Sequence, residues 1–86
     1  MKSHELDFYY FEACPYCQKV MTVISENKIK VNFKHIYDDL TNMQKLLHIT
    51  GRKTVPCLFI DGQPMHESSD IVAWLKTNIN DLKKTE

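Results

Sequence analysis

The chain lacks features that several large classes of protein require. It has no excess of either charge, because 11 lysine and arginine residues balance 11 aspartate and glutamate residues. A neutral chain argues against nucleic acid or an anionic membrane surface as the main partner. No uninterrupted apolar run approaches the roughly 20 residues that cross a bilayer, and no apolar signal core follows residues 1–5. We therefore expect neither a nucleic-acid partner nor a membrane partner.

Cysteine is also scarce, with three residues in a chain of 86. A small secreted protein that depends on disulfides would carry more cysteines, in an even number, so the reducing cytoplasm is the expected location. An apolar fraction of 43% is ordinary for a globular protein, and no repeat, linker or low-complexity segment divides the chain. We expect residues 1–86 to form one small, monomeric domain whose polar end, 80–86, frays.

Two of the cysteines form a Cys-x-x-Cys motif that organises the sequence. Cys14 and Cys17 follow a strand-forming aromatic run, 6–11, and precede a helical pattern over 18–27. The unpaired N–H groups of a helix start favour a thiolate at Cys14, and Pro15 suits the first helical turn. Cys14 is therefore the expected nucleophile, and Cys17, on the same helix face, is the expected resolving thiol. Half of a zinc site and an inert pair are the alternatives, but zinc would require further ligands.

The next part of the chain predicts a strand and a helix. Residues 31–37 alternate apolar and polar side chains, which is typical of a half-exposed strand. Thr41 can cap the helix that follows, and Gly51 can end it. The apolar stripe of this helix consists of Leu40, Met43, Leu46, Leu47 and Ile49.

The last third of the chain predicts a hairpin and a helix. Residues 55–60 form a third strand and residues near 63–66 a fourth. The turn 61–62, Asp-Gly, is a tight hairpin signal, so these two strands should be antiparallel. A final helix spans about 68–78, with Ser68 or Ser69 as its cap.

Three motifs, spread over nearly the whole chain, make it resemble a glutaredoxin. They are Cys14-Pro15-Tyr16-Cys17, the stretch 51–56 (Gly-Arg-Lys-Thr-Val-Pro) and the stretch 68–70 (Ser-Ser-Asp) at the start of the last helix. The resemblance implies an α/β, thioredoxin-like fold of order βαβαββα, with a four-stranded mixed sheet ordered 2-1-3-4 and three flanking helices. It also implies glutathione as co-substrate, disulfide-bearing or glutathionylated proteins as partners, and thiol–disulfide exchange that serves cell redox homeostasis.

The resemblance also implies a binding site for glutathione. A cis Val55–Pro56 bond would leave the Val55 backbone open to pair with the tripeptide as an added strand does. The amides of Ser69 and Asp70, at a helix start, would hold its γ-glutamyl carboxylate, and the Ser69 hydroxyl or the Asp70 carboxylate would hold its amine. Helix capping alone also explains these two residues. Pro15 and Tyr16 would lie beside the thiolate, and Thr54 would precede Val55 in the site. Gln44, Arg52 and Lys53 would lie near the glycyl carboxylate. Solvated side chains are the alternative for the last three.

Two positions depart from the glutaredoxin pattern. Glutaredoxins usually carry a lysine where this chain has Phe11, and often two glycines where it has His66-Glu67. The stretch 67–71, Glu-Ser-Ser-Asp-Ile, looks instead like the Glu-Ser stretch of glutathione transferase N-terminal domains. We interpret the chain as a glutaredoxin with a transferase-like glutathione site.

The sequence leaves two other functions open. Phe11 in place of lysine is compatible with a thioredoxin-like dithiol reductant served by a flavoprotein reductase. A glutathione-ligated iron–sulfur carrier is the third, but family members that hold clusters mostly lack the Cys-Pro-Tyr-Cys form. The four histidines show no metal-ligand spacing, so no metal is expected. We expect Cys57 to pack in the core as a small hydrophobe, with a regulatory thiol as the alternative.

Overall fold

The computed structural model describes residues 4–85, and a mixed β-sheet lies at its centre. The sheet has four strands in the order β2-β1-β3-β4. They are β1 (Leu6–Tyr10), β2 (Asn32–His35), β3 (Cys57–Ile60) and β4 (Gln63–Met65). β1 runs parallel to β2 and antiparallel to β3, and β3 and β4 form the antiparallel hairpin that the sequence predicts. The predicted strand order is therefore confirmed.

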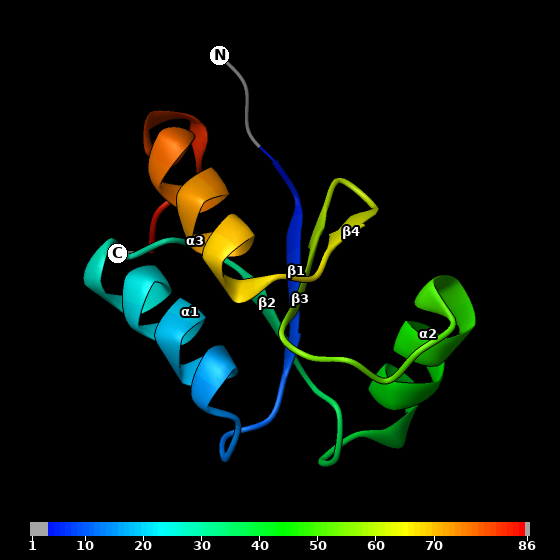
Figure 1. Ribbon diagram of the computed structural model, residues 1–86. Coiled ribbons are helices and arrows are strands. Elements are labelled where there is room, and N and C mark those ends of the chain that lie inside the picture. Colours follow the sequence, from blue (N-terminus) through cyan, green and yellow to red (C-terminus); the bar gives the residue numbers. More distant parts are fainter. Residues whose placement is uncertain (1–3, 86) are drawn as a thin grey trace.

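Three α-helices cover the two faces of the sheet. They are α1 (Pro15–Glu26), α2 (Leu40–Thr50) and α3 (Ser68–Thr77), and a short 3-10 turn, η1 (Ile79–Asp81), follows α3. α1 and α3 lie side by side on one face, and α2 lies alone on the other (Figure 1). Within residues 4–85, none of these helices has the length and apolar character that crossing a membrane requires. The element order and layers are those of the thioredoxin-like fold.

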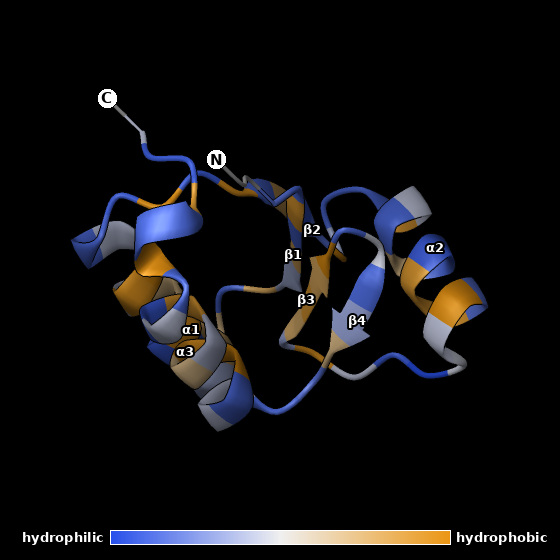
Figure 2. Cartoon of the chain, turned by 90° about the horizontal axis from the view of Figure 1, so that it is seen from above, coloured by the Kyte–Doolittle hydropathy of each residue, from blue (hydrophilic) through white to orange (hydrophobic). Residues whose placement is uncertain are grey.

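Each face of the sheet carries its own hydrophobic cluster. Successive strand residues point to opposite faces, so Phe8 packs beneath α1 and α3, whereas its neighbour Tyr9 packs beneath α2. Figure 2, seen from above, shows the hydrophobic strand β3 between the two helical layers and the more hydrophilic strand β4 at the edge. Cys57 is fully buried in the cluster under α2, which confirms its predicted place in the core.

Helix α2 differs from its prediction in two respects. Its cap is Asp39, whose carboxylate accepts the backbone N–H of Thr41 at 3.0 Å, so the prediction of Thr41 as the cap is wrong. Of the predicted apolar stripe only Leu46 is buried, because the helix meets the sheet along one narrow face. Leu40, Leu47 and Ile49 are 62%, 43% and 46% exposed, respectively. The predicted end of the helix at Gly51 is confirmed, since this glycine has a left-handed φ of 79°.

The C-terminal segment is held against the body of the protein. Leu82 is buried, and the backbone N–H of Thr85 donates to the carbonyl oxygen of Lys28 at 2.7 Å. The prediction that the chain end frays is therefore wrong for residues 80–85, because one apolar side chain and a backbone pairing fix it. Glu86 lies outside the described residues.

Candidate functional site

Cys14 lies at the N-cap of α1, where the loop after β1 meets the helix. Its sulfur accepts the backbone N–H of Cys17 at 3.4 Å and lies 4.0 Å from the carbonyl oxygen of Val55. Pro15 occupies the first turn, as predicted, where a missing N–H costs no hydrogen bond. An N–H donor and the positive end of the helix dipole therefore both face the Cys14 sulfur, which is an arrangement that favours a thiolate.

The other two thiols lie in environments that disfavour a charge. Cys17 is fully buried one turn into α1, and burial raises the pKa of its thiol to about 12. Burial likewise raises the pKa of Cys57 to about 11. All three cysteines are free thiols. Near neutral pH, Cys17 and Cys57 are protonated, so Cys14 is the cysteine placed to act as nucleophile.

A groove of about 260 Å³ opens beside Cys14. It is bounded by the first turn of α1, the segment that leads into β3, and the approach to α3. The Val55–Pro56 peptide bond on its floor is cis, as the resemblance implies. The residues that line it are Tyr16, Thr54, Val55, Pro56, His66, Glu67 and Ser68. Four predicted site residues, Tyr16, Thr54, Val55 and Pro56, are thus brought together.

The start of α3 closes one end of the groove. Glu67 is the N-cap residue, and its side chain makes no capping hydrogen bond, so the prediction of Ser68 or Ser69 as the cap is wrong. The N–H of Ile71 bonds to the carbonyl oxygen of Glu67 at 2.9 Å, so the amides of the three preceding residues have no acceptor within the helix. Ser69 and Asp70 carry two of these amides, but their side chains are exposed and lie outside the groove lining. The lining residues here are Glu67 and Ser68.

The remaining predicted site residues lie further out. Arg52 and Lys53 are exposed in the segment between α2 and β3, and Gln44 is exposed on α2. None of the three lines the groove. The charge of Arg52 nevertheless acts on His66 at the edge of the groove, where it contributes to lowering the pKa of the imidazole.

His66 is a groove residue that the sequence reasoning did not assign. Its Nδ1 atom is buried and has no hydrogen-bond partner. Burial, followed by the positive charge of Arg52, lowers the pKa of the ring from its ordinary value of 6.5. A neutral imidazole therefore lines the groove at neutral pH. The sequence did hold one signal for this residue, because His66 lies in a stretch where glutaredoxins often have two glycines.

A second cluster of polar side chains lies beyond the other flank of the Cys14 loop. The N–H groups of Tyr37 and Asp38 donate to Nδ1 of His35 at 3.2 and 3.0 Å. The ring proton is therefore on Nε2, which donates to the Glu12 carboxylate at 2.5 Å. This hydrogen bond holds the pKa of Glu12 below its ordinary range. Both ring nitrogens of His35 already have hydrogen-bond partners. We therefore interpret the cluster as a link between the ends of β1 and β2 rather than as a set of metal ligands.

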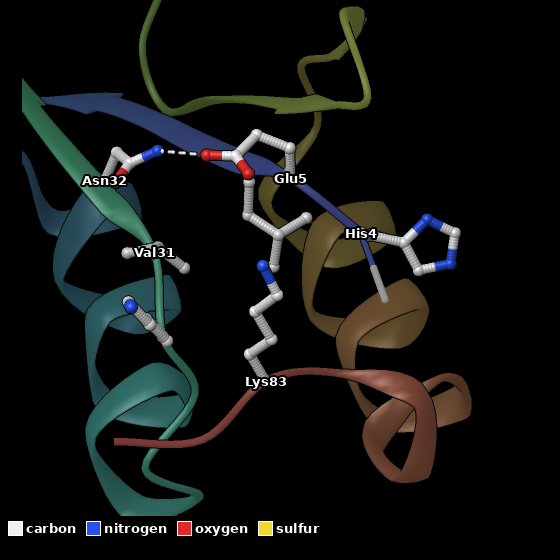
Figure 3. A pocket seen from close by; sticks show the side chains of 7 residues that line it. His4, Glu5, Val31, Asn32 and Lys83 are labelled. Carbon is white, nitrogen blue, oxygen red and sulfur yellow. Dashed lines mark hydrogen bonds between the residues drawn. The ribbon is translucent and has the colours of Figure 1, made fainter. Parts of the chain in front are cut away.

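A smaller hollow of about 110 Å³ lies between the starts of β1 and β2 and the C-terminal segment (Figure 3). It is away from the Cys14 end of β1, and a hydrogen bond of 2.7 Å from Asn32 to Glu5 crosses its rim. The residues that line it are His4, Glu5, Leu6, Lys30, Val31, Asn32 and Lys83. The Cys14 sulfur instead lies 4.0 Å from the carbonyl oxygen of Val55, which lines the groove, so that groove is the candidate functional site.

Comparisons with known proteins agree with this geometry. The chain matches the family described as "Glutathione S-transferase, N-terminal domain" over residues 8–81. Glutaredoxin 3 of Escherichia coli is 28% identical over 68 residues, which cover 79% of this chain and 82% of the relative. The family match spans the Cys-x-x-Cys motif and the groove.

Solved structures share the fold. Glutathione transferase Omega 3C from Trametes versicolor superposes with a TM-score of 0.77 at 23% identity, over 92% of this chain and 35% of that one. Glutaredoxin 2 from Salmonella typhimurium, solved in complex with glutathione, superposes with a TM-score of 0.70 at 27% identity. That match covers 87% of this chain and 34% of the glutaredoxin. The protein belongs to the family of glutathione S-transferase N-terminal domains, and it shares their thioredoxin-like fold with the glutaredoxins that it matches.

Proposed function

We propose that the protein is a glutathione-dependent thiol–disulfide oxidoreductase that reduces protein disulfides and protein–glutathione mixed disulfides. The observation that carries the proposal is the position of the Cys14 sulfur. It accepts an N–H at the start of α1 and lies within 4.0 Å of the Val55 carbonyl oxygen, at the edge of a groove. A nucleophilic sulfur beside an open backbone segment is what exchange with a peptide disulfide requires.

The monothiol route uses Cys14 alone. Its thiolate attacks the glutathione sulfur of the mixed disulfide, the bond between the two original sulfurs breaks, and the substrate protein leaves as a thiolate that takes up a proton. Cys14 now carries glutathione. The thiolate of a second glutathione attacks that glutathione sulfur, releases glutathione disulfide and restores Cys14. In the net reaction one free glutathione is oxidised as the substrate cysteine is reduced, and the other half of the glutathione disulfide comes from the substrate itself.

The dithiol route also needs Cys17, and it ends when two glutathione molecules reduce the Cys14–Cys17 disulfide that it forms and leave as glutathione disulfide. Cys14 attacks a protein disulfide and forms a mixed disulfide with one of its sulfurs. Cys17 then attacks Cys14, forming the Cys14–Cys17 disulfide and releasing the reduced partner. Cys17 must lose its proton in this step, and the released thiolate can accept it. Because the pKa of Cys17 is raised to about 12, we expect this step to be slower than the monothiol route.

Glutathione would lie along the groove. The backbone of Val55 would pair with the cysteinyl unit as an added strand does. The γ-glutamyl carboxylate would accept the free amides of the first turn of α3, which carries Ser69 and Asp70, and the carboxylate of Glu67 would hold its amine. Arg52, Lys53 and Gln44 are proposed to act at longer range on the glycyl carboxylate. We propose that residues 1–86 work as one monomeric unit in a reducing compartment such as the cytoplasm.

A coupled assay tests this function. The substrate is a glutathionylated peptide, and electrons come either from glutathione with glutathione reductase or from thioredoxin reductase alone. We expect turnover with the glutathione system and none with thioredoxin reductase. Turnover with thioredoxin reductase only would instead identify a thioredoxin-like reductant.

A further inference from the structure

An aromatic pair borders the nucleophile on the side of the β1–α1 loop. Phe11 lies three residues before Cys14, and its carbonyl oxygen accepts the Cys14 N–H at 3.3 Å. The ring of Tyr37, which follows β2, packs on Phe11 with 5.2 Å between centroids and a tilt of 60°. We call Phe11 and Tyr37 the aromatic rim. Tyr37 is 57% exposed, so the rim presents an apolar surface to solvent next to the reactive sulfur.

The fold does not account for this exposure. Phe11 is half-buried between the two core clusters, but Tyr37 reaches neither. Leu40, three residues further on at the start of α2, is also exposed, at 62%. A single exposed apolar side chain is ordinary, but a packed aromatic pair with an open face can contact a partner. A surface beside a nucleophile is a place for the substrate.

Negatively charged side chains lie next to the aromatic rim. Each of its residues is followed by a carboxylate, Glu12 after Phe11 and Asp38 after Tyr37, with side chains 72% and 79% exposed. The two carboxylates converge on His35, whose ligand atoms lie within 4.8 Å of theirs. His35 donates one hydrogen bond to Glu12 and none to Asp38. Lys34 acts on Asp39, so Glu12 and Asp38 leave a negative charge beside the rim.

We infer that the aromatic rim docks the protein part of a protein–glutathione mixed disulfide, and that this part carries an apolar residue and a basic residue beside the modified cysteine. This inference rests on the proposed function. Glutathione occupies the groove along Val55, and the substrate protein must leave from Cys14 without crossing it. The rim lies on the other flank of the Cys14 loop. An apolar side chain gains contact with Phe11 and Tyr37, and a basic side chain gains attraction from Glu12 and Asp38.

Two glutathionylated peptides of equal length test the inference. One carries leucine before the modified cysteine and arginine after it, and the other carries serine and glutamate. We expect kcat/KM for the first to exceed that for the second by about tenfold at low salt, which corresponds to about 1.4 kcal/mol. Raising the ionic strength to about 1 M, where the Debye length is about 3 Å, should reduce this ratio.

Variants test the apolar part and the charged part of this surface separately. Tyr37→Ser should lower kcat/KM for the leucine–arginine peptide about threefold or more, and Asp38→Asn should remove most of the salt dependence. Phe33→Ser is the matched control, because Phe33 is also half-exposed, at 50%, but lies near the C-terminal end of α1. It should leave the ratio unchanged. A ratio near one in the parent, or the parental ratio in both Tyr37→Ser and Asp38→Asn, would overturn the inference.

A small substrate distinguishes this failure from failure of the proposed function. The mixed disulfide of cysteine and glutathione has no flanking residues, so the parent and Tyr37→Ser should reduce it equally fast. If Tyr37→Ser slows this substrate as well, the rim contacts glutathione and the inference is wrong. If the parent does not reduce it at all, the proposed function fails.

Docking can also be measured directly, by NMR titration with versions of the two peptides that carry serine in place of cysteine. Equal affinity for both peptides would overturn the inference too.

Discussion

The backbone N–H of Cys17 donates to the sulfur of Cys14 across 3.4 Å. The donor lies in the first turn of α1 and the acceptor at its N-cap, and both side chains are buried, so the backbone of Cys17 can stabilise a negative charge on Cys14. Burial raises the pKa of the Cys17 thiol by more than a backbone hydrogen bond from Phe11 lowers it. The two cysteines of the motif therefore lie in different electrostatic environments before any substrate binds.

This difference predicts selective alkylation. With iodoacetamide at about pH 8, Cys14 should be modified first, because the thiolate is the species that reacts. The pKa values of about 12 and about 11 leave Cys17 and Cys57 almost entirely protonated. Peptide mapping by mass spectrometry over time should find Cys14 labelled at least tenfold faster than either. Equal labelling of Cys57 would contradict the assignment of Cys14 as the reactive thiol.

The residues that the sequence predicted best are those fixed by local geometry. A cysteine before a proline at a helix start stands at the N-cap in any fold that keeps that helix, so Cys14 could be placed without tertiary information. Val55 was placed by its motif, and the aromatic run 6–11 was placed as a buried strand, with Phe8 and Tyr9 both buried in the structure.

What the sequence could not supply depends on packing. Leu47 and Ile49 fit the helical period as well as Leu46 does, and only the narrow contact of α2 with the sheet decides that Leu46 alone is buried. The pairing that holds Thr85 to Lys28 joins distant parts of the chain, so a polar end looked unanchored. The role of His66 follows from what surrounds it in the groove, which no local pattern shows.

Leu46 should account for most of the anchoring of α2. It is fully buried against the sheet, whereas its neighbour Leu47 is 43% exposed. Leu46→Ala should lower the free energy of unfolding by about 2–5 kcal/mol, through lost burial and the cavity that remains. Leu47→Ala should lower it by less than about 1 kcal/mol. Urea denaturation of both variants measures this, and equal losses would mean that α2 is seated differently.

His66 should make the protein less stable in acid. A histidine whose pKa is lowered in the folded state stabilises it fully above its unfolded pKa, here 6.5, and that contribution is lost as the pH falls through the folded value. Arg52 opposes protonation and Glu67 favours it, but burial is the largest cause. His66→Gln should therefore flatten the decline in Tm between about pH 7 and pH 5.

His48→Gln is the control for this experiment, because His48 is exposed on α2. It should reproduce the parental decline. If the His66→Gln profile also overlies that of the parent, His66 is not held neutral by its surroundings.

The two placements of the γ-glutamyl amine can be separated kinetically. Glu67 lines the groove and has no capping bond, whereas Asp70 is exposed in the same turn and outside the lining. A hydrogen bond to a charged group contributes about 1.5–3 kcal/mol, so Glu67→Gln should raise the KM for a glutathionylated substrate roughly tenfold or more. Asp70→Asn should raise it about threefold at most, through the helix dipole. The opposite order of effects would place the amine at Asp70.

The central claim is that Cys14 alone performs glutathione-dependent exchange. The most direct measurement is the rate at which Cys14→Ser and Cys17→Ser reduce the cysteine–glutathione mixed disulfide, with glutathione and glutathione reductase in excess. Cys17→Ser should keep at least about a third of the parental kcat, because the monothiol route needs one sulfur, and Cys14→Ser should show no turnover above the uncatalysed rate. Parental activity in Cys14→Ser, or complete loss in Cys17→Ser, would contradict the account.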